Sequence, residues 1–269
     1  MNFEHLEVEK TDGIATLWLN RPEKRNALSE DLWADIPRAM ADLDADEGVR
    51  VVILAARGSA FCVGIDVAML ASLQPAGGSH ASQSREIYRI VKRLQRTVSC
   101  LADSPKPVIA AVHGYCLGAG LDLITACDIR LASADAVFSV RETKMGLVAD
   151  VGSLQRLPAI VGAGATTEMA YTGGDFDARW ALEKGLINSI HSDAKAVNEE
   201  AHKLAASIAA NSPLVTQGIK HILAAGEDRT VKEALDYVAL WNSSFLLSND
   251  LMEAIAAFAE KRPPRFEGS

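Results

Sequence analysis

The first part of the chain changes from a strand-like to a helix-like spacing of its apolar residues. Residues 3–19 predict a β-hairpin: residues 6–9 alternate, Asp12-Gly13 supplies the turn, and residues 14–19 continue as the second strand. Ser29 then offers a helix N-cap, and the two acids after it suit the positive first turn of a helix. We expect that helix to run to about residue 43, with a kink at Pro37.

Short apolar or β-branched runs further along the chain predict buried strands. Residues 73–83 are rich in Pro, Gly, Ser and Ala and are expected to form a mobile surface loop, followed by a helix over residues 84–101. A glycine-rich turn leads into another helix near Gly118. The predicted strands are residues 51–55, 107–112, 129–132 and 136–139.

After residue 149 the pattern is mostly helical, with helices predicted over residues 196–210, 214–225 and 231–247. No repeat of fixed period occurs, and no proline-rich linker separates two parts of the chain. The order of elements therefore predicts an α/β fold that forms one continuous structural unit. We expect a core over residues 1–200 and a helical C-terminal region over residues 201–269.

Charge and composition argue against several classes of protein. The formal net charge is −8, whereas phosphate backbones are bound by clustered cations, so no nucleic-acid partner is expected. No run of about 18 residues is apolar without interruption, so no membrane span is expected. The first residues lack the basic and then apolar order of a signal peptide. The cysteines form no CxxC pair and lie among apolar residues, which favours reduced thiols and a cytoplasmic location.

Two glycine-centred turns, residues 60–66 and residues 113–120, each follow a predicted strand. Glycine lets the backbone approach a ligand closely, and the second turn also opens a helix, whose N-terminus favours negative charge. Together the turns could aim two N–H donors at one carbonyl oxygen, as an enolate requires. Either turn alone also fits an ordinary tight turn. A dinucleotide fingerprint is disfavoured, because the third glycine is missing.

Three carboxylates are candidates for chemistry: Asp122 in an apolar predicted helix, Glu142 after a predicted strand, and Asp150 in a segment without another charge. An acid that loses hydration has a raised pKa, closer to the range that proton transfer needs. A helix cap or a buried ion pair is the alternative for any one of them. Three together, close to two turns that favour anions, point toward catalysis.

The order of these motifs resembles the crotonase (enoyl-CoA hydratase/isomerase) superfamily over essentially the whole chain. The resemblance rests on residues 20–28 (NRPEKRNAL), on the two glycine turns and on residues 155–158 (QRLP). It implies a crotonase-type spiral of ββα units with a C-terminal helical trimerisation region, and homotrimers that often pair into hexamers. It also implies an acyl-CoA thioester substrate and an oxyanion hole made by the backbone N–H groups of Ile65 and Ala119.

Within that family the three acids resemble the pattern of the dienoyl-CoA isomerases. Hydratases typically carry glutamates at the positions of Asp122 and Glu142 and glycine at that of Asp150, while Δ3-Δ2-enoyl-CoA isomerases use one principal acid near Glu142. The resemblance implies a β-oxidation isomerase that converts 3,5-dienoyl-CoA to 2,4-dienoyl-CoA. Glu142 would be the base at C2 and Asp150 the acid near C6, with Asp122 tuning or orienting them. The alternatives are an enoyl-CoA hydratase, a Δ3-Δ2-enoyl-CoA isomerase and a non-catalytic scaffold or RNA-binding protein of the same fold.

The resemblance also implies contacts with the acyl-CoA. Lys24 and Arg25 are expected near the coenzyme A phosphates, with a solvated loop as the alternative. Phe258 and Lys261 match tail positions that reach the adenine pocket of a neighbouring subunit, with structural packing as the alternative. No metal is expected, because no group of residues has metal-ligand spacing, and no cofactor is expected, because coenzyme A is part of the substrate. The other predicted contacts are Ala27, Cys62, Val63, Gly64, Asp66 and Gly118.

Overall fold

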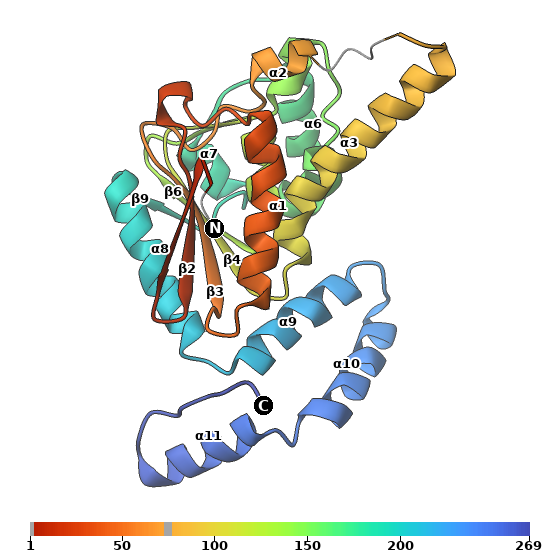
Figure 1. The fold of residues 1–269 in the computed structure, drawn as a ribbon. Helices are drawn as coiled ribbons and strands as arrows, with labels where there is room; N and C mark the ends of the chain where they lie inside the picture. Colours follow the sequence, from red (N-terminus) through yellow and green to blue (C-terminus); the bar gives the residue numbers. More distant parts are fainter. Residues whose placement is uncertain (1–2, 73–76) are drawn as a thin grey trace.

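A six-stranded sheet with the order β1-β2-β3-β4-β6-β9 forms the centre of the protein, in a computed structural model that describes residues 3–72 and 77–269 (Figure 1). The first two strands pair as the predicted antiparallel hairpin, with Thr11 opposite Ile14. The other neighbours are parallel, and each parallel step needs a crossover that places helices over the sheet. The strands are β1 (Leu6–Thr11), β2 (Ile14–Leu19), β3 (Val51–Ala56), β4 (Val108–Val112), β6 (Ile129–Ser133) and β9 (Ser189–His191).

A second, three-stranded sheet has the order β5-β7-β8 and consists of β5 (Tyr115–Leu117), β7 (Val137–Ser139) and β8 (Phe176–Asp177). Cys62 pairs with Cys116 of β5 in an isolated bridge. Its N–H donates to the Tyr115 carbonyl at 3.0 Å, and its carbonyl accepts from the Leu117 N–H at 2.9 Å. These bonds hold the two glycine turns next to each other.

In the central strands, the two faces of the large sheet bury alternate residues, as the two-residue period of a strand requires. In β3, Val52, Leu54 and Ala56 belong to the core shared with α1, α3 and α4. Val51, Ile53 and Ala55 belong to the second core, beneath α8. The helices are α1 (Glu30–Ala45), α2 (Val67–Ser72), α3 (His80–Asp103), α4 (Ala119–Thr125), α5 (Ser153–Val161), α6 (Ala163–Thr172), α7 (Ala178–Glu183), α8 (Ala194–Ala209), α9 (Pro213–Gly226), α10 (Val231–Phe245) and α11 (Asn249–Glu260), with 3-10 turns η1 (Pro22–Lys24) and η2 (Arg141–Met145).

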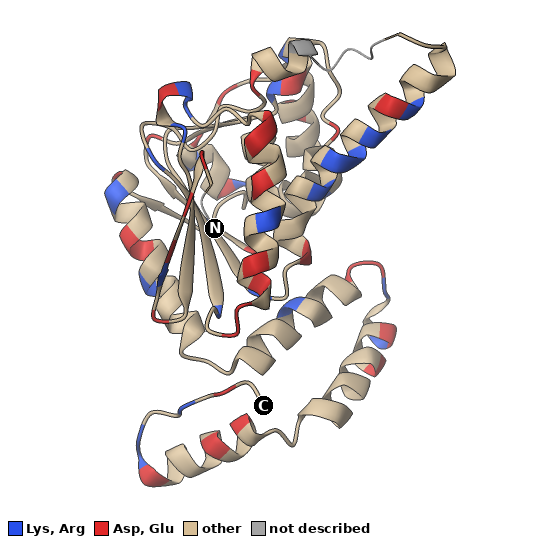
Figure 2. Ribbon diagram, viewed as in Figure 1, with Lys and Arg blue, Asp and Glu red and all other residues tan. Residues whose placement is uncertain are grey.

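The helix α1 continues through Pro37, where the sequence predicts a kink. Proline has no N–H for the carbonyl four residues earlier, which belongs to Trp33. Thr97 of α3 supplies the missing donor, because its hydroxyl donates to the Trp33 carbonyl at 2.7 Å. A neighbouring helix thus satisfies the group that the proline leaves free. Basic residues lie along much of α3 and acidic residues along α1 (Figure 2). Arg93 of α3 forms an ion pair with Glu30 of α1.

The C-terminal helices α9, α10 and α11 extend away from the core as an arm (Figure 1). The preceding helix, α8, crosses residue 200 and packs on the sheet through Val197, Ala201 and Ala205, so the expected division at that residue falls inside a core helix. None of the described helices combines the length and the apolar character that crossing a membrane requires.

The predicted α/β fold is confirmed, and the largest error concerns the segment before α3. Residues 80–83 were expected in a loop but belong to the helix, which begins at His80 because the Ser79 side chain caps it by accepting from the Ser82 N–H. Residues 73–76 of that expected loop lie outside the described residues. The short elements β5, β8, β9, α2 and α7 were not predicted, since few residues in each carry a periodic signal. The longer helix α11 was not predicted either.

Candidate active site

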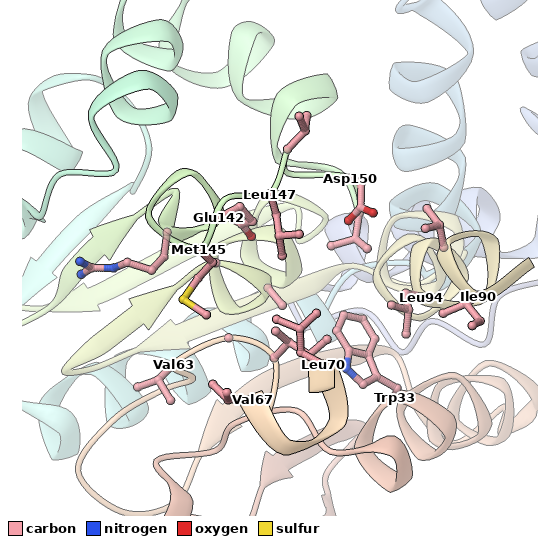
Figure 3. A pocket seen from close by; sticks show the side chains of 18 of the residues that line it. Trp33, Val63, Val67, Leu70, Ile90, Leu94, Glu142, Met145, Leu147 and Asp150 are labelled. Carbon is pink, nitrogen blue, oxygen red and sulfur yellow. The ribbon is translucent and has the colours of Figure 1, made fainter. Parts of the chain in front are cut away.

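A cavity of about 290 Å³ lies between α2, α3 and the segment that connects β7 to α5 (Figure 3). Val63, Val67 and Leu70 lie on one side of it, and Glu142, Leu147 and Asp150 lie on the opposite side. Trp33 of α1 and Ile90 and Leu94 of α3 lie together at one end. The lining is mostly apolar with few polar groups, which is the usual character of a small-molecule site.

Ile65 and Ala119, one residue from each glycine turn, line this cavity. Leu28 donates to the Gly64 carbonyl at 2.8 Å and accepts from the Asp66 N–H at 3.0 Å, which leaves the N–H of Ile65, between them, unused. Ala119 is the first residue of α4, where an N–H has no partner within the helix. Neither N–H has an acceptor anywhere in the described part of the chain.

Two glycines bring these N–H groups and a carboxylate together. Gly64 has a φ of +100°, and a Cβ there would come within 3.6 Å of the Ala119 nitrogen. Gly118 has a φ of +53°, and a Cβ there would come within 3.1 Å of Oε1 of Glu142. A side chain at either position would therefore be strained and would occupy the space next to the free N–H groups.

Glu142 lies in the turn η2, directly after β7, and lines the cavity. Its Oε2 is buried and has no hydrogen-bond partner among the described residues. Burial, together with the charge of Asp122, raises the pKa of Glu142 to about 7. A carboxyl group with this pKa can accept or release a proton near neutral pH.

Asp122 lies on α4, is fully buried and does not line the cavity. Its Oδ1 accepts two hydrogen bonds from Ser153, one from the backbone N–H at 2.5 Å and one from the hydroxyl. Its Oδ2 has no partner among the described residues. Burial raises the pKa of Asp122 to about 6, although the bonds from Ser153 lower it.

Asp150 reaches the cavity from the loop before α5. Gln95 of α3 donates to its backbone carbonyl at 2.8 Å and so ties this loop to the helix. Much of Asp150 is exposed, but its carboxyl group faces the cavity, and desolvation raises its pKa. Of the three predicted acids, the structure thus brings Glu142 and Asp150 to one cavity and places Asp122 behind it.

The predicted contacts in the first glycine turn have structural partners. Asp66 accepts from Arg21 at 2.6 Å, and this guanidinium holds the pKa of Asp66 below its usual value. Cys62 is buried, and desolvation raises the pKa of its thiol to about 12, so it is not a nucleophile near neutral pH. Val63, Gly64 and Gly118 line the cavity.

Lys24 and Arg25 are exposed and lie outside the cavity, and Ala27 also lies outside it. The Arg25 backbone carbonyl accepts from the Val63 N–H at 3.2 Å. Because Val63 lines the cavity, this bond places the backbone of Arg25 next to the cavity. Phe258 and Lys261, by contrast, belong to α11 and its C-cap in the arm, and Phe258 is 88% exposed. Their expected contact with a neighbouring subunit stays a prediction.

Sequence reasoning missed the apolar wall of the site and two residues that hold its acids. Trp33, Leu70, Ile90 and Leu94 have the helical spacing of ordinary core residues, so nothing in their pattern marks them as cavity residues. Ser153 and Gln95 are single polar residues, and only the folded chain shows which acid each one contacts.

One group of possible metal ligands lies away from the cavity, near the beginning of the chain. Side-chain atoms of Glu4, His5 and Asp31 lie within 4.8 Å of one another. Glu4 and Asp31 are exposed, and exposed acids often gather without binding an ion. The expected absence of a metal stays a prediction.

Comparison with known proteins identifies the family of the chain. Residues 9–269 match the enoyl-CoA hydratase/isomerase family. The peroxisomal Δ3,5-Δ2,4-dienoyl-CoA isomerase of Arabidopsis thaliana is 40% identical over 98% of this chain and 98% of its own. The mitochondrial Δ3,5-Δ2,4-dienoyl-CoA isomerase of Dictyostelium discoideum is 41% identical over 99% of this chain and 92% of its own.

The fold also has a close counterpart among solved structures. The crystal structure of an enoyl-CoA hydratase from Bacillus anthracis superposes with a TM-score of 0.90 at 29% identity, covering 99% of this chain and 100% of that one. The cytoplasmic location expected for this chain stays a prediction, since the names of the two relatives place them in peroxisomes and mitochondria. The chain belongs to the enoyl-CoA hydratase/isomerase family and has the crotonase fold.

Proposed function

We propose that this chain is a Δ3,5-Δ2,4-dienoyl-CoA isomerase. The observation that carries the proposal is that two carboxyl groups with raised pKa, those of Glu142 and Asp150, line one apolar cavity together with two free N–H groups. The names of the relatives in Arabidopsis and Dictyostelium support the same reaction.

In the proposed reaction the thioester oxygen accepts hydrogen bonds from the N–H groups of Ile65 and Ala119. Glu142 removes a proton from C2, and the C–H electrons pass into the conjugated system to give a dienolate. Asp150 then donates a proton to C6, and the electrons return to form the 2,4-diene. The proton on Glu142 and the charge on Asp150 are exchanged with solvent before the next turnover.

Coenzyme A would extend from the cavity past the first glycine turn. Lys24 and Arg25 would meet its phosphates, because the Arg25 backbone is bonded to cavity residue Val63 and both cations are exposed there. The backbone of residues 62–66 and of Ala27 would accompany the thioester arm.

The position of Asp122 favours an isomerase over a hydratase. Hydration needs two carboxylates that hold one water between them next to the substrate. Asp122 does not line the cavity, and one of its oxygens is engaged by Ser153. The second carboxyl group in the cavity belongs to Asp150, which suits proton delivery to a remote carbon.

The test is incubation of the purified protein with a 3,5-dienoyl-CoA while the ultraviolet absorbance of the conjugated 2,4-dienoyl product is followed. A parallel reaction with a simple 2-enoyl-CoA, analysed for the 3-hydroxyacyl product, measures hydratase activity. The proposal expects turnover of the diene to exceed hydration greatly. Hydration without diene isomerisation would overturn it.

A further inference from the structure

The contacts around Asp122 assign a role to a residue outside the cavity. Ser153, the first residue of α5, is fully buried and donates both its N–H and its hydroxyl to the same oxygen, Oδ1 of Asp122. Hydrogen bonds to a charged carboxylate are stronger than those to its neutral form. This pair of donors therefore favours the anionic state of Asp122.

Oδ2 of Asp122 and Oε2 of Glu142 are both buried, and neither has a partner among the residues that the structure describes. Oε1 of Glu142 lies 3.1 Å from the position that a Cβ of Gly118 would take, and the Asp122 N–H donates to the Gly118 carbonyl, so both acids adjoin the same residue. Charge on one of two neighbouring desolvated carboxyl groups makes charge on the other more costly, so one of them ionises at a lower pH than the other. The donors on each side chain decide which one.

The remaining charged and titratable groups do not replace Ser153 in this role. Asp150 adds a negative charge toward both carboxyls, while Arg156 partly offsets the charge of Asp122 from a distance. The thiols of Cys62 and Cys116 also face Asp122, and burial raises the pKa of each far enough to keep it neutral. No other side chain in the described residues donates a hydrogen bond to the Asp122 carboxylate.

We propose that Ser153 is a positioning residue, which keeps the negative charge on Asp122 and thereby keeps Glu142 protonated to higher pH. In this way Ser153 sets the pH above which Glu142 can act as a base. The proton distribution is a property of the free protein, and its use in catalysis rests on the proposed function.

The experiment is an infrared titration of the buried carboxyl stretch in the full-length protein, with glutamate carboxyl groups labelled with ¹³C to separate them from aspartate. Ser153→Ala removes the hydroxyl donor but keeps the backbone donor, so Asp122 should hold its proton to higher pH. Glu142, relieved of a charged neighbour, should lose its proton at a pH about one unit lower than in the wild type.

A second variant shows whether Ser153 acts through Asp122. Asp122→Asn should also lower the pH at which Glu142 ionises, and adding Ser153→Ala to it should change nothing further. Ser133→Ala is the matched control, because Ser133 is equally buried and also donates to an aspartate, Asp135, outside the cavity. It should leave the titration of Glu142 unchanged.

Two results would overturn the assignment: an unchanged Glu142 titration in Ser153→Ala, or an equal shift when Asn already occupies position 122. In Ser153→Ala and Asp122→Asn the rising limb of the pH profile of kcat/KM for the 3,5-dienoyl-CoA should move to lower pH. The shifts should rank the variants as the infrared titration of Glu142 does. If the titration moves as expected but the protein does not isomerise the diene, the role of Ser153 stands and the proposed function fails.

Discussion

At the scale of single residues, the burial of Glu142 has one cost for stability and one benefit for proton transfer. Burial makes the charge of its carboxylate costly, and the same burial brings its pKa to about 7, where a base can exchange protons efficiently. An ordinary glutamate ionises near 4.5. Between these two pH values the folded state binds more protons than the unfolded state. The stability that the neutral side chain contributes is therefore complete below about pH 4.5 and is lost as the pH rises through about 7.

Glu142→Gln should remove this pH dependence. The amide keeps the shape of the side chain but carries no charge, so the variant should melt a few degrees above the wild type at about pH 8 and show little difference at about pH 5. Thermal unfolding followed by circular dichroism at both pH values measures this. Glu168→Gln, at an exposed position on α6, is the control and should have no effect at either pH. Equal melting temperatures of Glu142→Gln and the wild type at about pH 8 would contradict the argument.

Asp150→Asn should separate proton delivery from binding. The amide can hydrogen-bond but cannot donate and recover a carboxyl proton, so turnover of 3,5-dienoyl-CoA should fall by about 10²–10⁴-fold. The dissociation constant of the product should change little, because the free N–H groups of Ile65 and Ala119 remain. Stopped-flow absorbance and calorimetric titration measure the two quantities. Asp228→Asn, on the exposed turn after α9, is the control. Turnover at the wild-type rate in Asp150→Asn would show that Asp150 does not deliver the proton in the dienoyl reaction.

The sequence identifies the acids of this site better than it identifies their arrangement. Apolar neighbours mark Asp122 and Asp150, whereas Glu142 is flanked by polar and charged residues and is marked only by its place after a predicted strand and by the family resemblance. Whether a carboxyl group opens into a cavity or lies behind it depends on how α4 and α5 meet, which no local pattern encodes. Only the contact with Ser153 shows that Asp122 belongs behind the cavity.

At the scale of elements, neighbours decide what local rules leave open. The strands β2, β3, β4, β6 and β7 were predicted to within a residue or two, since buried β-branched runs between turn residues carry a strong local signal. Pro37 was expected to kink α1, and the helix continues because Thr97, sixty positions further along the chain (97 − 37), donates to the carbonyl that the proline cannot serve. A compensation of this kind cannot be predicted from the residues around the proline.

Thr97→Val should therefore be destabilising through α1. Valine keeps the volume but leaves the buried Trp33 carbonyl without this donor, which should cost about 1–3 kcal/mol of unfolding free energy. Urea unfolding measures the loss. In a Pro37→Ala background the helix has its own N–H for that carbonyl, so the same substitution should cost clearly less. An equal cost in both backgrounds would mean that the bond does not replace the proline N–H.

At the scale of the whole molecule, the arm of α9, α10 and α11 exposes more apolar surface than a single copy of the chain covers. No residue of α10 is buried, and Val231 at its start is 78% exposed. Leu247, just after α10, is 89% exposed. Phe258 of α11 is exposed to a similar degree. Charged residues are sparse along much of α9 and α10 (Figure 2). Contiguous apolar surface of this kind marks an interface between proteins.

We therefore predict that the folded protein is a homo-oligomer held together through this arm, in line with the trimer or hexamer that the family resemblance implies. Leu235→Asp combined with Leu247→Asp places two charges on surface that an interface would bury, so the oligomer should dissociate at micromolar concentration. Sedimentation velocity measures the mass, and far-ultraviolet circular dichroism shows whether the helices persist. Tyr171→Asp, at a site on α6 that is 80% exposed, is the control outside the arm and should keep the wild-type mass. A wild-type chain that sediments as a folded monomer at this concentration would refute the prediction.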